Sequence, residues 1–278
     1  MIPEIPPEWE GLPHSLSLGW GVQSFGMLVL IEKGILRRPD CIIHADTGSE
    51  MPQTYQFEQE VGRPLIDRLG IPYYVVKSHY GRLHEAYREK EIMPLVGSRS
   101  CTDNYKILPV QRQLKKLFTK KYGKPSVISW LGITTDEAGR ASRAAASKSD
   151  CRKTRLWNPV CYPLLELNMS RQAVKDFIVD AGYPVPIKSG CFLCPYQSRK
   201  SWIRLKGRHP DLFEIALDLE HHARNRKDGK PSRLRLLGTE GTIDSLNNGS
   251  ELTDFIAMEF DDYDENITGC DSGGGCWL

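Results

Sequence analysis

The feature that most constrains the fold is a series of four short apolar runs, each ending in a polar or glycine-containing turn. The runs are "SLSLGW", "DCIIHADTG", "PYYVV" and "SVISWLGI". Continuous apolar runs of this length are typical of strands buried on both faces of a parallel sheet. Helical patterns lie between the runs; the first comprises Met27, Leu28, Leu30 and Ile31 and ends at Gly34. This alternation predicts an α/β fold, a Rossmann-like domain built on a parallel sheet.

Length and composition set the domain organisation. The chain has 278 residues, of which 40% are hydrophobic and 26% charged, which excludes disordered, collagen-like and mini-protein classes. The texture changes after Ile133, where "TTDEAGRASRAAASKSD" is polar and built of small residues, as in a site loop. We therefore expect a core at residues 1–133, a smaller, mostly helical and cysteine-rich part at 134–250, and an acidic tail containing Gly and Cys at 251–278.

Hydropathy and charge indicate where the protein acts and on what. The apolar stretch near Met27–Ile31 is too short to span a bilayer, and residues 1–15 lack an apolar signal core, so we expect a cytoplasmic protein without membrane contact. Residues 104–124 contain seven Lys/Arg and no acids, whereas residues 251–271 contain eight acids and no basic residue. Residues 199–235 form a second basic stretch. Such stretches fit a nucleic-acid backbone; solvated helix faces are the alternative.

A glycine-containing loop connects the first expected strand to the first expected helix. It reads S-x-G-x-G-V-Q-S and comprises Ser17, Gly19, Gly21, Gln23 and Ser24. Glycines let backbone amides approach a phosphate, the serines add hydroxyl donors, and the helix N-terminus favours an anion. The loop therefore predicts a phosphate site, with a plain glycine turn as the alternative.

Eight cysteines in a chain without a secretory signal favour metal or redox chemistry over a disulfide framework. Cys191 and Cys194 form a C-x-x-C motif, which lets one tight turn present two thiolates to one metal or cluster. Cys41 opens an expected buried strand and Cys161 lies in an apolar context, so both are expected to be packed thiols. Cys151 has no assigned role.

Several segments resemble one protein family in the same order. The loop resembles the S-G-G-x-D-S loop of PP-loop ATP pyrophosphatases, and "HADTGSEMPQTY" resembles the D-T-G segment of their phosphoadenosine phosphosulfate (PAPS) reductase branch. "SCTDNYKILPVQR", "WLGITTDEAGR", "YPLLELNMSRQ" and "KSGCFLCPYQSRKSWIRLK" resemble later blocks of PAPS reductase-like proteins of phages and bacterial islands. The resemblance spans Leu16 to Glu220. It implies a PP-loop domain of the adenine nucleotide alpha hydrolase-like superfamily.

The resemblance implies that ATP, an adenine nucleotide, binds at the carboxyl ends of the parallel strands. The loop residues expected to hold its phosphates are Ser17, Gly19, Gly21 and Ser24. Gln23 stands where the family pattern has Asp, which removes a negative charge from the loop and bears on how metal is handled.

Further residues follow from the same resemblance. Asp46, Thr47 and Gly48 are expected beside the nucleotide or its magnesium ion. Lys106 and Arg140 are the candidate catalytic residues, because their charges could neutralise phosphate in a transition state; solvated surface positions are the alternative for both.

Related tRNA thiolation enzymes combine one distant cysteine with a C-x-x-C motif to hold an iron-sulfur cluster with an open fourth position. Cys101, Cys191 and Cys194 offer the same arrangement, which implies a [4Fe-4S] cluster. Either Cys270 or Cys276 of the tail could supply a fourth thiolate, and Cys270 is our candidate ligand. Zinc and plain reduced thiols are the competing interpretations.

Together these features predict an ATP-dependent sulfurtransferase that adenylates a tRNA or DNA substrate and inserts sulfur, with a sulfur-donor protein as a further partner. One alternative is a sulfonucleotide reductase that uses a C-terminal cysteine, although the tail lacks the Glu and His of the E-C-G-[LI]-H motif. The other is a non-catalytic, nucleotide-sensing DNA-binding component.

Overall fold

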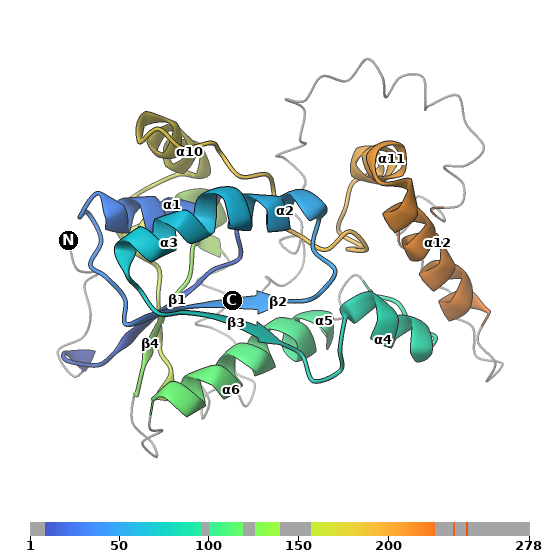
Figure 1. The fold of residues 1–278 in the computed structure, drawn as a ribbon, viewed down its shortest axis with the longest axis horizontal. Helices are drawn as coiled ribbons and strands as arrows, with labels where there is room; N and C mark the ends of the chain where they lie inside the picture. The colour runs from blue at the N-terminus through green and yellow to red at the C-terminus, as the bar shows by residue number, and fades with distance from the viewer. Residues whose placement is uncertain are drawn as a thin grey trace.

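The structure is a computed structural model that describes residues 9–95, 100–118, 126–139 and 157–225, together with Leu236 and Ile243. Its centre is a five-stranded, all-parallel sheet with the strand order β3-β2-β1-β4-β5 (Figure 1). The predicted α/β fold with a parallel sheet is confirmed. The described strands are β1 (His14–Ser17), β2 (Cys41–Asp46), β3 (Tyr73–Lys77), β4 (Ile128–Trp130) and β5 (Val160–Cys161).

Helices follow most of these strands, as parallel pairing requires. The longer described helices are α1 (Val22–Glu32), α6 (Leu108–Leu117), α10 (Arg171–Asp180), α11 (Arg199–Arg208) and α12 (Pro210–Arg224). The shorter ones are α2 (Pro52–Phe57), α3 (Arg63–Leu69), α4 (Leu83–Glu89), α5 (Ser100–Thr102) and α9 (Pro163–Glu166). Two π-helical turns, Glu58–Gly62 and Asp103–Ile107, join α2 to α3 and α5 to α6, and Thr135–Glu137 forms a 3-10 turn.

The strand order creates a crevice at one edge of the sheet. From β1 the chain adds β2 and β3 on one side, and it later adds β4 and β5 on the other side. The segments that leave β1 and β4 therefore diverge, although these two strands are hydrogen-bonded neighbours. In open parallel sheets, ligands bind in the crevice at the carboxyl ends of the strands where this reversal occurs.

Two layers of helices cover the sheet, with α1, α3 and α10 over one face and α6 over the other (Figure 1). On the first face α10 approaches α1 closely, because a Cβ atom at Gly26 would lie 2.3 Å from Cγ1 of Val174. The absence of a side chain at Gly26 thus lets the Val174 side chain of α10 pack directly against the backbone of α1. Since α1 and α10 pack on the sheet together, the starts of both helices are held in fixed positions.

A second apolar core lies beside the sheet and is built from α4, α11 and α12, with Trp202 and Phe213 among its fully buried side chains. The first core continues past residue 133, because Cys161 of β5, Leu164 of α9 and Val174 of α10 pack into it. The two cores therefore do not divide at residue 133. The division into domains at 1–133, 134–250 and 251–278 stays a prediction, and the tail lies outside the described residues.

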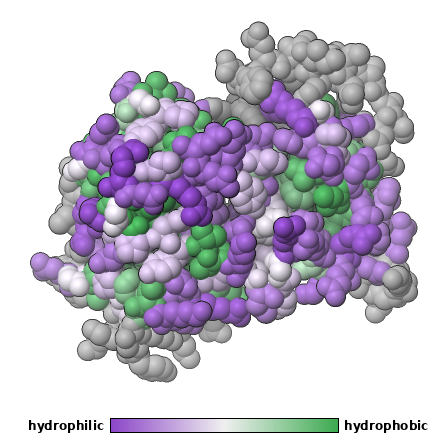
Figure 2. Space-filling view, viewed as in Figure 1, coloured by the Kyte–Doolittle hydropathy of each residue, from purple (hydrophilic) through white to green (hydrophobic). Residues whose placement is uncertain are grey.

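Hydrophilic residues cover most of the face shown in Figure 2, with apolar residues in small groups. Within the described part of the chain, every helix is too short or too polar to cross a membrane.

His14, the first residue of β1, is fully buried with cations and donors around its ring. Trp130 donates its indole N–H to Nδ1 at 2.8 Å, and the Arg37 guanidinium lies 3.4 Å from Nε2. Burial and Arg37 lower the pKa of His14 to about 4, against the opposing effect of Asp40. The ring is therefore a neutral acceptor in the folded protein.

We expect the free energy of unfolding to fall as the pH is lowered from 6.5 to about 4. In this range His14 binds a proton in the unfolded chain but not in the folded one, so protonation favours unfolding. The full shift corresponds to about 3 kcal/mol. Urea unfolding of the wild type and of His14→Gln across this range checks it, because the variant should lose this part of the slope. Identical slopes would contradict the prediction.

Candidate functional site

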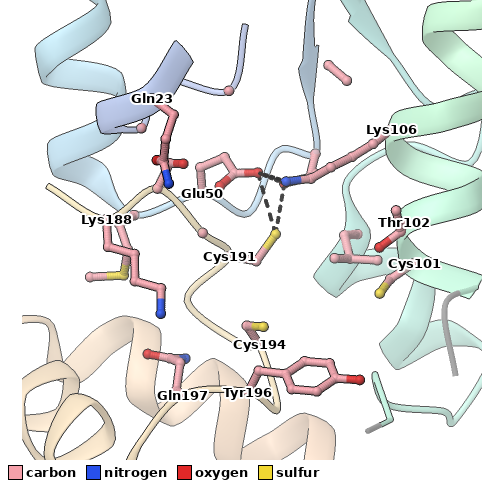
Figure 3. A pocket seen from close by; sticks show the side chains of 18 of the residues that line it. Gln23, Glu50, Cys101, Thr102, Lys106, Lys188, Cys191, Cys194, Tyr196 and Gln197 are labelled. Carbon is pink, nitrogen blue, oxygen red and sulfur yellow. Dashed lines mark hydrogen bonds and ion pairs between the residues drawn. The ribbon is translucent and has the colours of Figure 1, made fainter. Parts of the chain in front are cut away.

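A cavity of about 280 Å³ lies at the carboxyl ends of β1 and β2, where the strand order predicts a ligand site. One wall is the loop between β1 and α1. The opposite side is formed by the π-helical turn before α6 (Figure 3). Residues 188–198, which include the C-x-x-C motif, also line the cavity, and they begin beside the loop. Segments that are distant in sequence therefore meet around one space.

The predicted phosphate loop lines this cavity through Ser17, Gly19, Gly21 and Gln23. Ser17 is 5% exposed, and its hydroxyl has no hydrogen-bond partner among the described residues. No side chain caps α1 at Gly21, so the backbone N–H groups of its first turn lack intrahelical partners. A buried hydroxyl and a set of open amides at one helix N-terminus are suited to an anionic ligand.

Ser24 is not part of the cavity wall but braces the loop. Its hydroxyl accepts a hydrogen bond from Gly19 N and donates one to Gly21 O, both at 3.2 Å. Glycines permit the close packing around it: a Cβ atom at Gly21 would lie 2.8 Å from Ser189 Oγ, and one at Gly132 would lie 3.1 Å from Ser24 N. Side chains at these two positions would fill the space beside the first turn of α1.

Trp20, a buried residue of the same loop, anchors the loop to the protein core. Its φ of 58° lies in the left-handed region, which is unfavourable for a residue with a side chain. The indole is 1% exposed and packs edge-on against His44 and Tyr73. A Cβ atom at Gly62 would lie 2.1 Å from the indole, so the π-helical turn that ends at Gly62 makes room for the ring. The loop is thus fixed to the α2–α3 segment.

The D-T-G segment contributes unequally to the site. Thr47 lines the cavity, whereas Asp46 and Gly48 do not. Asp46 Oδ1 accepts hydrogen bonds from Gly48 N and Tyr55 Oη, each at 2.8 Å, and Oδ2 lies 3.4 Å from Lys77 Nζ. Burial alone would raise the pKa of Asp46, but these hydrogen bonds and Lys77 lower it. Asp46 thus stabilises the turn that follows it. To bind magnesium, its carboxylate would have to give up the ion pair with Lys77.

A buried polar cluster occupies the other side of the cavity. Glu50 Oε1 accepts a hydrogen bond from Thr47 Oγ1 at 3.1 Å, lies 3.5 Å from Lys106 Nζ and 3.6 Å from Cys191 Sγ (Figure 3). The Glu50 side chain is 4% exposed. Its charge raises the pKa of Lys106, against the effect of burial. Lys106 is therefore a fixed cation, paired with a carboxylate and next to a thiol.

Cys101, Cys191 and Cys194 all line the cavity, with Cys101 reaching it from the α5 side (Figure 3). The C-x-x-C motif forms a tight turn in which Cys194 N donates to Cys191 O at 3.1 Å. Burial raises the pKa of Cys194 to about 11 and also raises that of Cys191. Within the described residues, no three His, Cys, Asp or Glu side chains are placed to hold a single metal ion.

Other cysteines divide as follows. Cys41 and Cys161 are buried in the cores, and burial raises the pKa of each to about 12, as fits packed thiols. Cys151, Cys270 and Cys276 lie outside the described residues, as does Arg140.

Four charged residues of the cavity wall were missed by the sequence analysis, namely Glu50, Glu137, Arg171 and Lys188. The position of Glu50, close behind the D-T-G segment, was a signal that could have identified it. Glu137, Arg171 and Lys188 lie in segments that carry the family resemblance, but no chemical role was assigned to them. A scan against models of protein families and a search of curated proteins both found no match to the chain.

We expect Gly62→Ala to destabilise the protein through Trp20. The added methyl group must displace the indole or the π-helical turn, and overpacking of this kind costs about 1–3 kcal/mol. Urea unfolding of Gly62→Ala, Trp20→Phe and the double variant measures the coupling. The smaller phenyl ring should relieve the clash, so the penalty of Gly62→Ala should shrink in the Trp20→Phe background. An unchanged penalty would contradict the contact.

Proposed function

We propose that the chain is an ATP-dependent sulfurtransferase of the PP-loop, PAPS reductase-like type, which acts on a nucleic acid with the help of an iron-sulfur cluster. The observation that carries the proposal is the shared cavity: an anion-receptive loop lines one side, and three cysteines line the other. An enzyme that activates an oxygen with ATP and then replaces it with sulfur needs both groups within reach of one substrate atom.

ATP fits the loop side of the cavity. Among the described residues, the Ser17 hydroxyl lacks a partner and no side chain caps the first-turn amides of α1, and both line the cavity. In the proposed reaction an oxygen of the substrate attacks the α-phosphorus, the bond to the bridging oxygen breaks, and pyrophosphate leaves. Sulfide then attacks the adenylated carbon, and AMP departs with the oxygen.

The proposed ligands of an iron-sulfur cluster are Cys101, Cys191 and Cys194, which line the opposite side of the cavity and would hold it there. When bound, such a cluster supplies an iron position that can carry the incoming sulfur. Three thiolates leave that position open, and Cys270 of the tail is the candidate for a fourth ligand. The ion pair between Lys106 and Glu50 would place one positive and one negative charge at fixed positions next to Cys191.

A nucleic-acid substrate is supported by two basic helices that begin at the cavity. The π-helical turn that carries Lys106 continues into α6, which has three basic residues and no acids. Ser198 and Ser201 line the cavity where α11 begins, and α11 has five basic residues and no acids. Both helices lead away from the site, as two paths for a phosphate backbone would. ATP–pyrophosphate exchange stimulated by tRNA or DNA is the direct test of the proposed activity.

Nucleotide binding should depend on the loop. We expect Ser17→Ala to weaken ATP binding about tenfold or more, because a lost hydrogen bond to a charged group costs about 1.5–3 kcal/mol. We expect a similar loss for Gly21→Val, because its Cβ would lie 2.8 Å from Ser189 Oγ and the loop would have to shift. Ser78→Ala, a buried serine outside the cavity wall, is the matched control. Calorimetric titration measures the affinities, and wild-type affinity in both loop variants would remove the loop assignment.

Metal content should depend on the cavity cysteines. Protein purified without oxygen is expected to contain iron and acid-labile sulfide, and Cys191→Ser or Cys194→Ser should lose most of it, because a hydroxyl is a weaker ligand than a thiolate. Cys161→Ser, in the core, should retain it. Cys270→Ser should lower iron content if the tail supplies a ligand. Stoichiometric zinc without iron would refute the cluster and keep the ligand set.

A further inference from the structure

Arg171, the first residue of α10, is a cation in the cavity wall. Its Nε is shielded from solvent and has no hydrogen-bond partner, and its guanidinium forms no ion pair with any carboxylate of the described residues. Buried donors are almost always satisfied, so an unsatisfied one on a cavity wall indicates a missing acceptor.

The backbone fixes Arg171 on the phosphate-loop side of the cavity. Its N–H donates to the carboxylate of Asp136, and Thr135 N donates to Met169 O just before α10. The segment before this turn packs against the start of α1, since a Cβ atom at Gly132 would lie 3.0 Å from Gln23 Cβ. The start of α10 is thus connected through one short turn to the start of α1.

Two helices therefore begin on the same side of the cavity, but only the first turn of α1 is without a side-chain cap among the described residues, because Ser170 accepts from Ala173 N and Asp136 accepts from Arg171 N at the start of α10. Val22 and Arg171, the first residues of α1 and α10, both line it. The first turn of α1, a helix of 11 residues, contributes positive potential there, whereas the Asp136 carboxylate offsets that of α10. The buried Ser17 hydroxyl also lacks a hydrogen-bond partner among the described residues. This is independent evidence that an anion binds here.

The other cations of the cavity are engaged elsewhere. Lys106 pairs with Glu50 beside Cys191, whereas Lys188 lies below Gln23 with its ammonium group directed towards Gln197 (Figure 3), and its charge acts on the Cys194 thiol. The cavity therefore has a sulfur side, with Lys106, and a phosphate side, where the Arg171 guanidinium forms no ion pair with a carboxylate of the described residues. A charge that balances the phosphates of a nucleotide would come from Arg171.

We propose that Arg171 binds the β- and γ-phosphates of ATP and holds the pyrophosphate as it leaves. The inference rests on the proposed function. When the substrate oxygen bonds to the α-phosphorus, the electron pair of the breaking bond passes to the bridging oxygen of the pyrophosphate. A guanidinium can meet this developing charge with two parallel N–H donors. Arg171 is then a catalytic residue that favours cleavage between the α- and β-phosphates.

Inorganic pyrophosphate and AMP separate the two halves of ATP and are the probes of choice. Glu137 also lines the cavity, and its carboxylate would repel unshielded pyrophosphate, so the titrations contain Mg²⁺. We expect Arg171→Gln to weaken pyrophosphate binding about 10- to 100-fold and to leave AMP affinity unchanged. Arg171→Lys should recover only part of the loss, because a lysine lacks the planar fork. Lys175→Gln, one turn along the same helix, is the control for charge.

A stability measurement distinguishes binding from a structural role. Because the Arg171 guanidinium has no hydrogen bond to the described part of the chain, Arg171→Gln should unfold at the same urea concentration as the wild type. Unchanged pyrophosphate affinity in Arg171→Gln, or a loss of AMP affinity instead, would overturn the inference. If the wild type binds ATP through Ser17 and Gly21 but Arg171→Gln has no effect, only the inference fails. If the wild type binds neither ATP nor pyrophosphate, the proposed function fails with it.

Discussion

The backbone pairing between Glu50 and Cys191 is the contact on which the whole site depends. These residues form an isolated antiparallel bridge, flanked by hydrogen bonds from Met51 N to Gly190 O and from Phe192 N to Ser49 O. The bridge joins the turn after β2 to the cysteine turn across 141 positions of the sequence. Without this bridge, the C-x-x-C motif would not be held next to the strands that carry the phosphate loop.

Local patterns were sufficient to predict the sheet and the loop. The four apolar runs became four of the five parallel strands, and Ser17, Gly19, Gly21 and Gln23 line the cavity as the loop pattern indicated. The fifth strand, β5, has two residues and carries too short a pattern to be identified. Trp20 is the opposite case: a large residue in the left-handed region is favourable only because a distant glycine leaves room for its ring.

Residues that act through tertiary contacts could not be predicted. Glu50 follows the D-T-G segment, but its partners Lys106 and Cys191 reach it from other parts of the chain. Lys106 was expected as a phosphate ligand, and that role remains untested. Its ion pair places it beside the thiols. Asp46 was expected beside the nucleotide, yet its oxygens are engaged by Gly48, Tyr55 and Lys77. For Lys106 and Asp46, the residue type suggested a role in the site. The sequence did not show which side chains would surround each residue in the folded protein.

The way the loop is held has a consequence for how a ligand would bind. Left-handed backbone at a residue such as Trp20 costs about 1–3 kcal/mol, whereas burying an aromatic side chain contributes about 1.5–3 kcal/mol. These energies are of similar size, so burial of the indole offsets the backbone strain before any ligand is present. The Ser24 hydrogen bonds brace the opposite side of the loop. A phosphate would therefore meet amides already in position, and its binding energy would not be spent on ordering the loop.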